Sequence, residues 1–201
     1  MSKKQDQEEN SFHAKSLKEW SNWLSKNSET KKNVWLVQFH KSSGKPTTSY
    51  EEARDEALCF GWVDSVRNKR DAESSFLYFA KRNPKSNWSK VNKDRVEQLI
   101  QQKRMKKSGL AMVELAKKTG TWNALDLVEE LSIPSDLKKA LEKNKKANEY
   151  FSQFPKSTKR GILEWILNAK KEETRLKRIE ETVQLAEKNI RANQYRQPKG
   201  A

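Results

Sequence analysis

The side chains best suited to nucleophilic or acid–base chemistry in this sequence are one cysteine and two histidines. Cys59 lies between Leu58 and Phe60 at the inner end of a predicted apolar helix, where a thiol usually packs as a small hydrophobic group. A nucleophilic role would need a base beside it, for which His40 is the plausible partner, whereas His13 lies close to the N-terminus. No zinc-ligand spacing, phosphate-binding glycine loop or G-x-S-x-G motif occurs. The sequence therefore predicts no catalytic residue, metal or cofactor.

The most unusual residues concentrate between positions 59 and 95. An apolar run ends in the polar pair Asp64-Ser65, and the basic stretch that starts at Lys81 contains one indole, Trp88. Between residues 81 and 107, ten Lys or Arg residues stand against Asp94 and Glu97 alone.

If the strand that carries Asp64 pairs with a strand that ends at Lys81-Arg82, one carboxylate lies near two cations. These three charged groups then form either a structural ion pair or a polar cationic pocket at the sheet edge that captures an anionic group. The pocket hypothesis gives these candidate ligand-binding residues: Trp62, Asp64, Ser65, Lys81, Arg82, Trp88, Ser89, Asn92 and Arg95.

Three short apolar segments predict the strands that would carry this pocket. They are residues 34–39, 62–66 and 76–79. The charged stretch between the second and third predicts an antiparallel hairpin, and Gly61 predicts a turn into the second strand at which φ is positive. No Gly-rich βαβ repeat follows, so a doubly wound parallel sheet is disfavoured.

Two capping boxes predict the helices between these strands. Ser16 with Glu19, and Ser49 with Glu52, place a hydroxyl and a carboxylate where each satisfies a free backbone N–H group. From residue 90 onward the periodicity is helical throughout. The sequence predicts an α+β fold with a small antiparallel sheet in the order α-β-α-β-β, followed by an all-helical C-terminal half.

These patterns divide the chain into four segments. Residues 1–14 are expected to be a disordered tail, 15–131 an α+β domain, 132–195 a helical region and 196–201 a frayed tail. Ser86 or Asn87 is expected to cap the first helix of the basic stretch.

The charge of the chain suggests polyanionic partners. The 201 residues include 42 Lys+Arg and 27 Asp+Glu, a formal net charge of +15. Such a surplus attracts nucleic acid, anionic lipid or acidic protein surfaces, or acts only to keep the protein soluble. One cysteine allows no intramolecular disulfide, the polar N-terminus has no signal-peptide core, and no stretch approaches 18 apolar residues. The sequence predicts a cytoplasmic protein without a membrane span.

The run from Ala57 to Ser65, ALCFGWVDS, resembles the most recognisable motif of the bacteriocin-protection, YdeI/OmpD-associated family. The similarity extends over about residues 12–195 and includes Trp35-Leu36, Tyr50–Ala53, Phe79, Arg82, Ser86–Ser89, Asn92, Arg95, Met105, Gly109, Gly120–Trp122, Ile133-Pro134 and Phe151–Arg160. The chain has Ala80-Lys81-Arg82 where the family usually has Pro-Arg-Arg, which keeps the charge of the basic stretch without the proline.

This resemblance implies a YjbR/CyaY-like fold for residues 15–131 and a helical OmpD-associated-type region for 132–195. It also implies a non-enzymatic protein of stress resistance that protects against bacteriocins or antimicrobial peptides, binding a protein or small anionic partner through a basic, Trp-containing cleft. Two alternatives remain open. One is a non-specific nucleic-acid-binding protein, in which Lys and Arg pair with phosphates while aromatic rings stack on bases. The other is an enzyme of an unrecognised class that uses the same cleft, with Asp64, Ser65 or Cys59.

Overall fold

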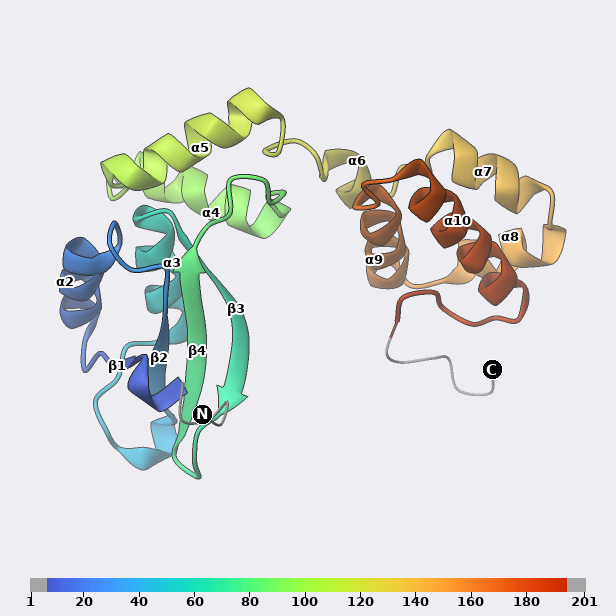
Figure 1. The fold of residues 1–201 in the computed structure, drawn as a ribbon. Coiled ribbons are helices and arrows are strands. Elements are labelled where there is room, and N and C mark those ends of the chain that lie inside the picture. Colours follow the sequence, from blue (N-terminus) through green and yellow to red (C-terminus); the bar gives the residue numbers. More distant parts are fainter. Residues whose placement is uncertain (1–6, 195–201) are drawn as a thin grey trace. The chain divides into compact units, whose positions relative to one another are not determined.

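The computed structural model describes residues 7–194, which form two compact units divided between Asn123 and Ala124 (Figure 1). Each unit has a hydrophobic core of its own. The sequence placed the boundary later, after residue 131. Leu125 and Val128 account for the difference, because both are buried in the core of the second unit. The predicted frayed tail, residues 196–201, lies outside the described residues.

A four-stranded sheet forms the centre of the first unit. Its spatial order is β1-β2-β4-β3, and its strands are β1 (Ser11–His13), β2 (Asn33–Phe39), β3 (Trp62–Lys69) and β4 (Ser74–Lys81). The three predicted strands pair antiparallel, which confirms the α+β fold class, but β1 pairs with β2 in parallel, so the sheet is mixed.

Strand β1 corrects the prediction of a disordered tail over residues 1–14, of which 1–6 lie outside the described residues. The Phe12 ring stacks on Trp20 and Trp23, and the Asn10 carbonyl accepts a hydrogen bond from the Trp35 N–H at 2.9 Å. These contacts come from distant residues, and a three-residue strand is too short for its period-two pattern to be recognised.

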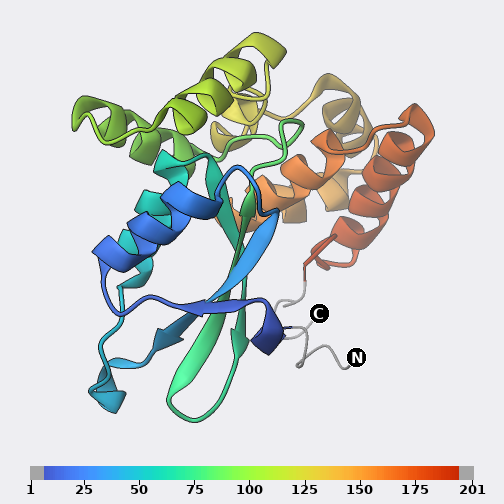
Figure 2. The same cartoon turned by 60° about the vertical axis from the view of Figure 1, so that its left-hand side comes forward.

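Helices α2 (Leu17–Asn27) and α3 (Tyr50–Cys59) cover one face of the sheet (Figure 2). The strand residues buried with these helices include Val34, Leu36, Trp62, Leu77 and Phe79. The alternating residues Trp35, Val37 and Phe76 form a smaller buried cluster on the opposite face. Successive side chains of a strand point to opposite faces, so this alternation fixes which candidate site residues face the helices.

Both predicted helix starts are confirmed at their N-caps. Ser49 and Glu52 form the complete capping box of α3. At α2 the Ser16 hydroxyl accepts the hydrogen bond from the Glu19 N–H, but the Glu19 carboxylate accepts from the N–H of Lys15 rather than from Ser16. A short 3-10 helix, η1 (Lys41–Ser43), follows β2.

Helices α4 (Lys90–Gln101) and α5 (Lys107–Thr119) complete the first unit. The N-cap of α4 is Ser89, whose hydroxyl accepts from the Asn92 N–H, and not the predicted Ser86 or Asn87. Helix α5 ends at Gly120 in the left-handed conformation.

The start of α5 lies directly against the end of α3. A Cβ atom added to Gly109 would lie 2.2 Å from the Cys59 carbonyl oxygen, which is closer than any side chain allows. Gly61 has φ 77°, as predicted for the turn after α3, and a Cβ atom there would lie 3.0 Å from Met112 Cγ. Two glycines therefore permit the close packing of these two helices.

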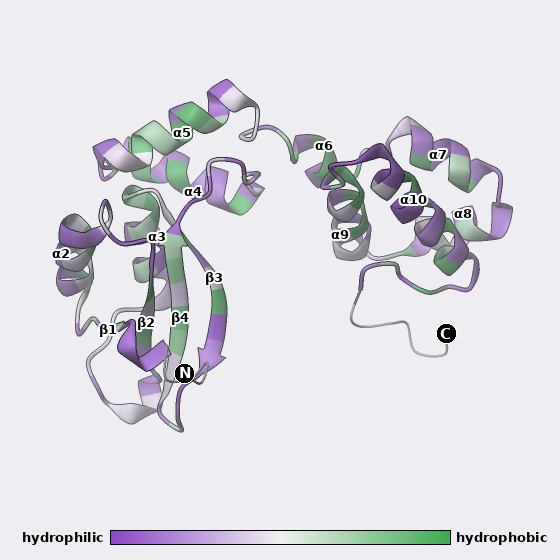
Figure 3. Ribbon diagram, viewed as in Figure 1, coloured by the Kyte–Doolittle hydropathy of each residue, from purple (hydrophilic) through white to green (hydrophobic). Residues whose placement is uncertain are grey.

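In the second unit, the described residues 124–194 form helices and connecting loops without a strand. The helices are α6 (Asp126–Glu129), α7 (Ser135–Glu142), α8 (Lys145–Gln153), α9 (Lys156–Leu167) and α10 (Glu172–Glu187). Helix α10 buries Ile179 and Ala186 in the core, whereas Leu176 is 56 % exposed. Figure 3 shows how hydrophilic and hydrophobic residues alternate along these helices, as expected when each packs only one side on a core. Within residues 7–194, no helix is long and apolar enough to span a membrane.

Candidate functional site

A pocket of about 780 Å³ opens at the C-terminal end of β4, and we refer to it as the Arg82 pocket. Its lining comes from the turn before β2, the turn between α3 and β3, the loop after β4 and the first turns of α5. Pockets of this size hold small ligands. The lining includes the charged residues Glu29, Lys32, Lys81 and Arg82 and the apolar residues Phe60, Pro84, Ala111 and Met112.

Arg82 is buried although it is a cation, with only 6 % of its surface exposed. Its backbone N–H donates to the Gly61 carbonyl at 3.0 Å, which continues the pairing of β3 and β4 past the strand ends. Its guanidinium lies 3.8 Å from the centre of the Trp88 ring, and Nη2 donates to the Asn87 backbone carbonyl at 2.7 Å. The stacked ring and the carbonyl hold the side chain in one orientation.

The charge of Arg82 has no carboxylate partner within the described part of the chain. Its Nε is buried and donates no hydrogen bond there. Burial lowers the pKa of Arg82 to about 10, which still leaves the side chain charged at neutral pH. A buried cation is costly unless a counter-ion and hydrogen bonds compensate it, and an anion in the pocket would supply both.

Two exposed lysines add to the positive charge at the rim. Lys81 Nζ donates to the backbone carbonyl of Glu29 at 3.0 Å, and Lys32 lies three residues after Glu29 in the connection between α2 and β2. The rim and the buried arginine together provide three cations against the single carboxylate of Glu29. The electrostatic field of the pocket therefore favours an anion.

Neither of the two tryptophans predicted for the basic cleft lines this pocket. Trp62 is fully buried, and its Nε1 donates to the Ser28 carbonyl at 3.2 Å. Trp88 is 3 % exposed and contacts Trp122 on one side and the Arg82 guanidinium on another. Trp88 contributes to the site through the position of Arg82.

Asp64 and Ser65 lie away from the pocket. In the register of β3 and β4, Trp62 is opposite Lys81 and Asp64 is opposite Phe79. The Asp64 carboxylate accepts a hydrogen bond from the Tyr50 hydroxyl at 2.9 Å, so it pairs with α3 and not with the cations of the basic stretch. Ser65 is exposed, at an irregularity of the ladder.

The remaining three candidates have structural roles. Ser89 caps α4 through its bond from the Asn92 N–H. Arg95 Nη2 forms a short hydrogen bond to Asp55, which ties α4 to α3. Of the nine predicted binding residues, the structure brings only Lys81 and Arg82 into the lining of the pocket.

The lining residues that sequence reasoning missed come from remote segments. Glu29 and Lys32 precede β2, and Ala111 and Met112 belong to α5. Gly61 is the sequence signal for part of this lining, because a glycine with positive φ marks the turn against which α5 packs. Nothing in the local sequence of α5 indicates which strand end it approaches.

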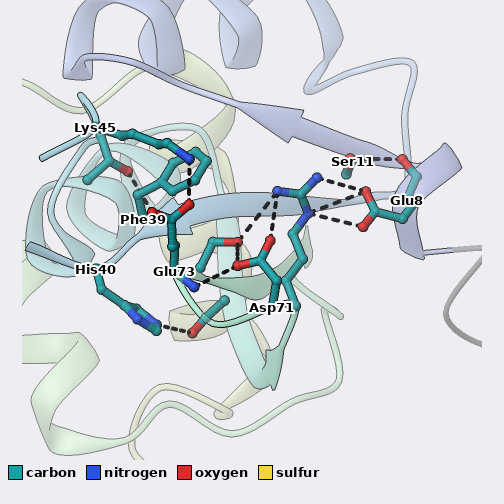
Figure 4. Close-up of polar contacts among 11 residues, drawn as sticks. Glu8, Ser11, Phe39, His40, Lys45, Asp71 and Glu73 are labelled. Carbon is teal, nitrogen blue, oxygen red and sulfur yellow. Dashed lines mark hydrogen bonds and ion pairs between the residues drawn. The ribbon is translucent and has the colours of Figure 1, made fainter. Parts of the chain in front are cut away.

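The cysteine and the histidine that were considered as nucleophile and base lie at opposite ends of the sheet. Burial raises the pKa of the Cys59 thiol to about 11, beside the end of β4. The His40 N–H donates to the Glu73 carbonyl just before β4 begins, and its ring contacts Ser75 (Figure 4). An eight-residue strand is roughly 25 Å long, so the two side chains do not form a catalytic pair.

Ion pairs stabilise the end of the sheet at which His40 lies (Figure 4). Arg70 contacts Glu8 and Asp71, and Lys45 Nζ lies 2.5 Å from a Glu73 carboxylate oxygen. These groups tie the hairpin between β3 and β4 to neighbouring loops. The described residues contain no cluster of side chains that would hold a metal ion.

Two family models match the chain. Residues 12–112 match a family described as Domain of unknown function (DUF8412), and residues 130–189 match the family described as Bacteriocin-protection, YdeI or OmpD-Associated. The second match confirms the resemblance found in the sequence, whereas the motif of residues 57–65 and all lining residues of the Arg82 pocket fall within the first. No curated protein and no solved structure matches the chain.

Proposed function

Since the chain belongs to the DUF8412 family and carries a bacteriocin-protection, YdeI or OmpD-associated domain at residues 130–189, we propose that it is a non-enzymatic protection protein. In this proposal it acts by binding an anionic partner, and the Arg82 pocket is the binding site.

The observation that supports this site is the uncompensated charge of Arg82. Two half-buried arginines of the chain pair with carboxylates, Arg160 with Glu129 and Arg175 with Asp136. Arg82 is more deeply buried than either, and it pairs with no carboxylate within the described residues. Binding sites differ from structural ion pairs in this respect, because the missing partner is supplied by the ligand.

Arg82 is held by the protein at three points. Its N–H, its Nη2 and the face of its guanidinium are each fixed by a contact with the protein. A donor that is held in place before the ligand arrives loses little conformational entropy on binding.

We expect small anions to bind at this site, and an NMR titration of the whole chain tests it. Acetate and inorganic phosphate are added separately, and the backbone amide signals of Gly61 and Arg82 are followed. In the wild type these signals should move with saturation. In Arg82→Gln the shifts should disappear, because the substitution removes the buried charge.

Arg67→Gln is the matched control, since Arg67 is an exposed arginine of β3 that does not line the pocket. It should keep the wild-type response to both anions. Equal responses of all three proteins, or no response of the wild type, would contradict the proposed site.

A further inference from the structure

The Arg82 pocket combines one buried cation with an apolar wall. Phe60 and Pro84 contribute apolar surface next to Arg82, and Ala111 and Met112 continue it along one side of α5. These two residues lie three and four positions after Ser108, so the three share one face of the helix. A ligand that reaches Arg82 therefore has an apolar surface beside it.

The hydrogen-bond donors at the charged end suit one small negative group. Nη2 of Arg82 is already bonded to the Asn87 carbonyl and Nε is enclosed by the protein, which leaves Nη1 to meet a ligand. Lys81 Nζ is bonded to the Glu29 carbonyl, and the Glu29 carboxylate itself lines the pocket. A phosphate dianion needs more donors than a carboxylate, and its two charges are repelled by Glu29 more strongly than the single charge of a carboxylate.

We propose that the Arg82 pocket binds a carboxylate that carries an apolar body, with the carboxylate at Arg82 and the body along Phe60, Ala111 and Met112. This inference rests on the proposed function and specifies its ligand. The carboxylate supplies the counter-ion that the guanidinium lacks, and the apolar body covers wall residues that would otherwise contact water.

Four probes separate the two parts of the proposal: acetate, hexanoate, hexanol and inorganic phosphate. Dissociation constants are measured by NMR titration of the wild-type chain, following the amides of Gly61 and Arg82 and the Met112 methyl group. Hexanoate should bind at least about tenfold more tightly than acetate, because each methylene group removed from water favours binding. Hexanol, which has a similar body without the charge, should bind more weakly than hexanoate, and so should phosphate.

Two variants test the two ends of the pocket. Arg82→Gln should abolish the preference for hexanoate over hexanol. Ala111→Trp fills the apolar part from an exposed position of α5 and leaves Arg82 unchanged. It should weaken hexanoate about tenfold while acetate binding stays nearly the same, since acetate has almost no apolar body to displace. This second variant keeps the test decisive if Arg82→Gln does not fold.

The outcomes distinguish this inference from the function on which it rests. If phosphate binds in an Arg82-dependent way and hexanoate binds no better than acetate, the pocket is an anion site but the ligand class is wrong. If none of the anions shifts these signals, both proposals are overturned. Equal binding of hexanoate by Ala111→Trp and the wild type would also overturn the assignment of the apolar wall.

Discussion

Arg82 and Arg95 both belong to the basic stretch, yet their guanidinium groups have different surroundings. Arg95 bonds to Asp55, so its charge is compensated inside the protein. Arg82 is buried against Trp88 and a backbone carbonyl, neither of which carries a negative charge. At the scale of single residues, a structural arginine differs from a candidate binding arginine in having a carboxylate partner within the protein.

A prediction at this scale concerns Arg95→Gln. Burial raises the pKa of Asp55, but the hydrogen bonds from Arg95 and Arg54 outweigh burial and hold the pKa below its ordinary value. A carboxyl group with a lowered folded-state pKa stabilises the fold above its unfolded pKa, and this stability is lost as the pH falls through the folded pKa. Since Arg54 remains, we expect the variant to lose roughly 2 kcal/mol of unfolding free energy at neutral pH.

Denaturant unfolding at pH 7 and acid unfolding of both proteins check this expectation. The variant should unfold at a higher pH than the wild type, because the pKa of Asp55 rises when Arg95 is removed. Lys177→Gln serves as the control, since it breaks an exposed pair with Glu173 and should change stability very little. If the two variants have the same effect, the Arg95–Asp55 bond contributes no more than a surface pair.

At the scale of elements, the wall of the pocket depends on how closely α5 approaches the turn after α3. Gly109 allows the backbone of α5 to touch the Cys59 carbonyl, and Gly61 turns the chain into β3 beneath Met112. The Lys106 N–H donates to the same Cys59 carbonyl at 3.0 Å, and the Ser108 hydroxyl donates to the Phe60 carbonyl at 3.1 Å. Helix α5 is therefore positioned by its first turn.

Gly109→Ala and Gly61→Val test this contact. We expect Gly109→Ala to lose about 2 kcal/mol of unfolding free energy, because the new methyl group overlaps the Cys59 carbonyl and the helix must move. Gly61→Val should lose well over ~1 kcal/mol, since it adds a contact with Met112 to the strain of a β-branched residue at positive φ.

Gly120→Ala is the control for strain without steric overlap. Gly120 also has positive φ, 78°, but a Cβ atom there would meet nothing within 4 Å. Gly120→Ala should lose about 1 kcal/mol of unfolding free energy, the usual cost of an L-residue in this conformation. All four proteins are compared by urea unfolding. Should Gly109→Ala be as stable as the wild type, the close approach of α5 and α3 is not required for the fold.

At the scale of the whole molecule, the chain consists of two units with separate cores. The first core gathers the sheet, α2–α5 and four of the tryptophans, and the second gathers α6–α10. The charge of +15 gives the chain a general attraction to polyanions. Trp62, Trp88 and Trp122 are buried and do not offer their faces to bases, so such attraction would depend on lysines and arginines and would weaken with salt.

We expect each unit to fold by itself. Fragments 7–123 and 124–194 should each show a cooperative thermal transition, because each keeps its complete buried cluster. Circular dichroism on heating measures this. A fragment of residues 132–194, cut at the boundary that the sequence predicted, lacks Leu125 and Val128 and should melt at a lower temperature than 124–194. Equal melting temperatures would show that these two residues are not needed by the second core.

The sequence alone determined the features that depend only on residues close together in the chain. Period two predicted β2, β3 and β4, the serine N-caps predicted the starts of α2 and α3, and Gly61 predicted a turn with positive φ. The family resemblance followed from local motifs in the same way. These features can be predicted from sequence because hydrogen bonds and side-chain spacing within a few residues determine them.

Only the tertiary structure decided which charges face one another. Asp64 pairs with Tyr50 because the register of β3 places it opposite Phe79, and strand β1 exists because Phe12 reaches the two tryptophans of α2. The Arg82 pocket required the meeting of a strand end with a helix that begins about 25 residues later. Contacts of this kind depend on how whole elements pack, and no local pattern of residues specifies that packing.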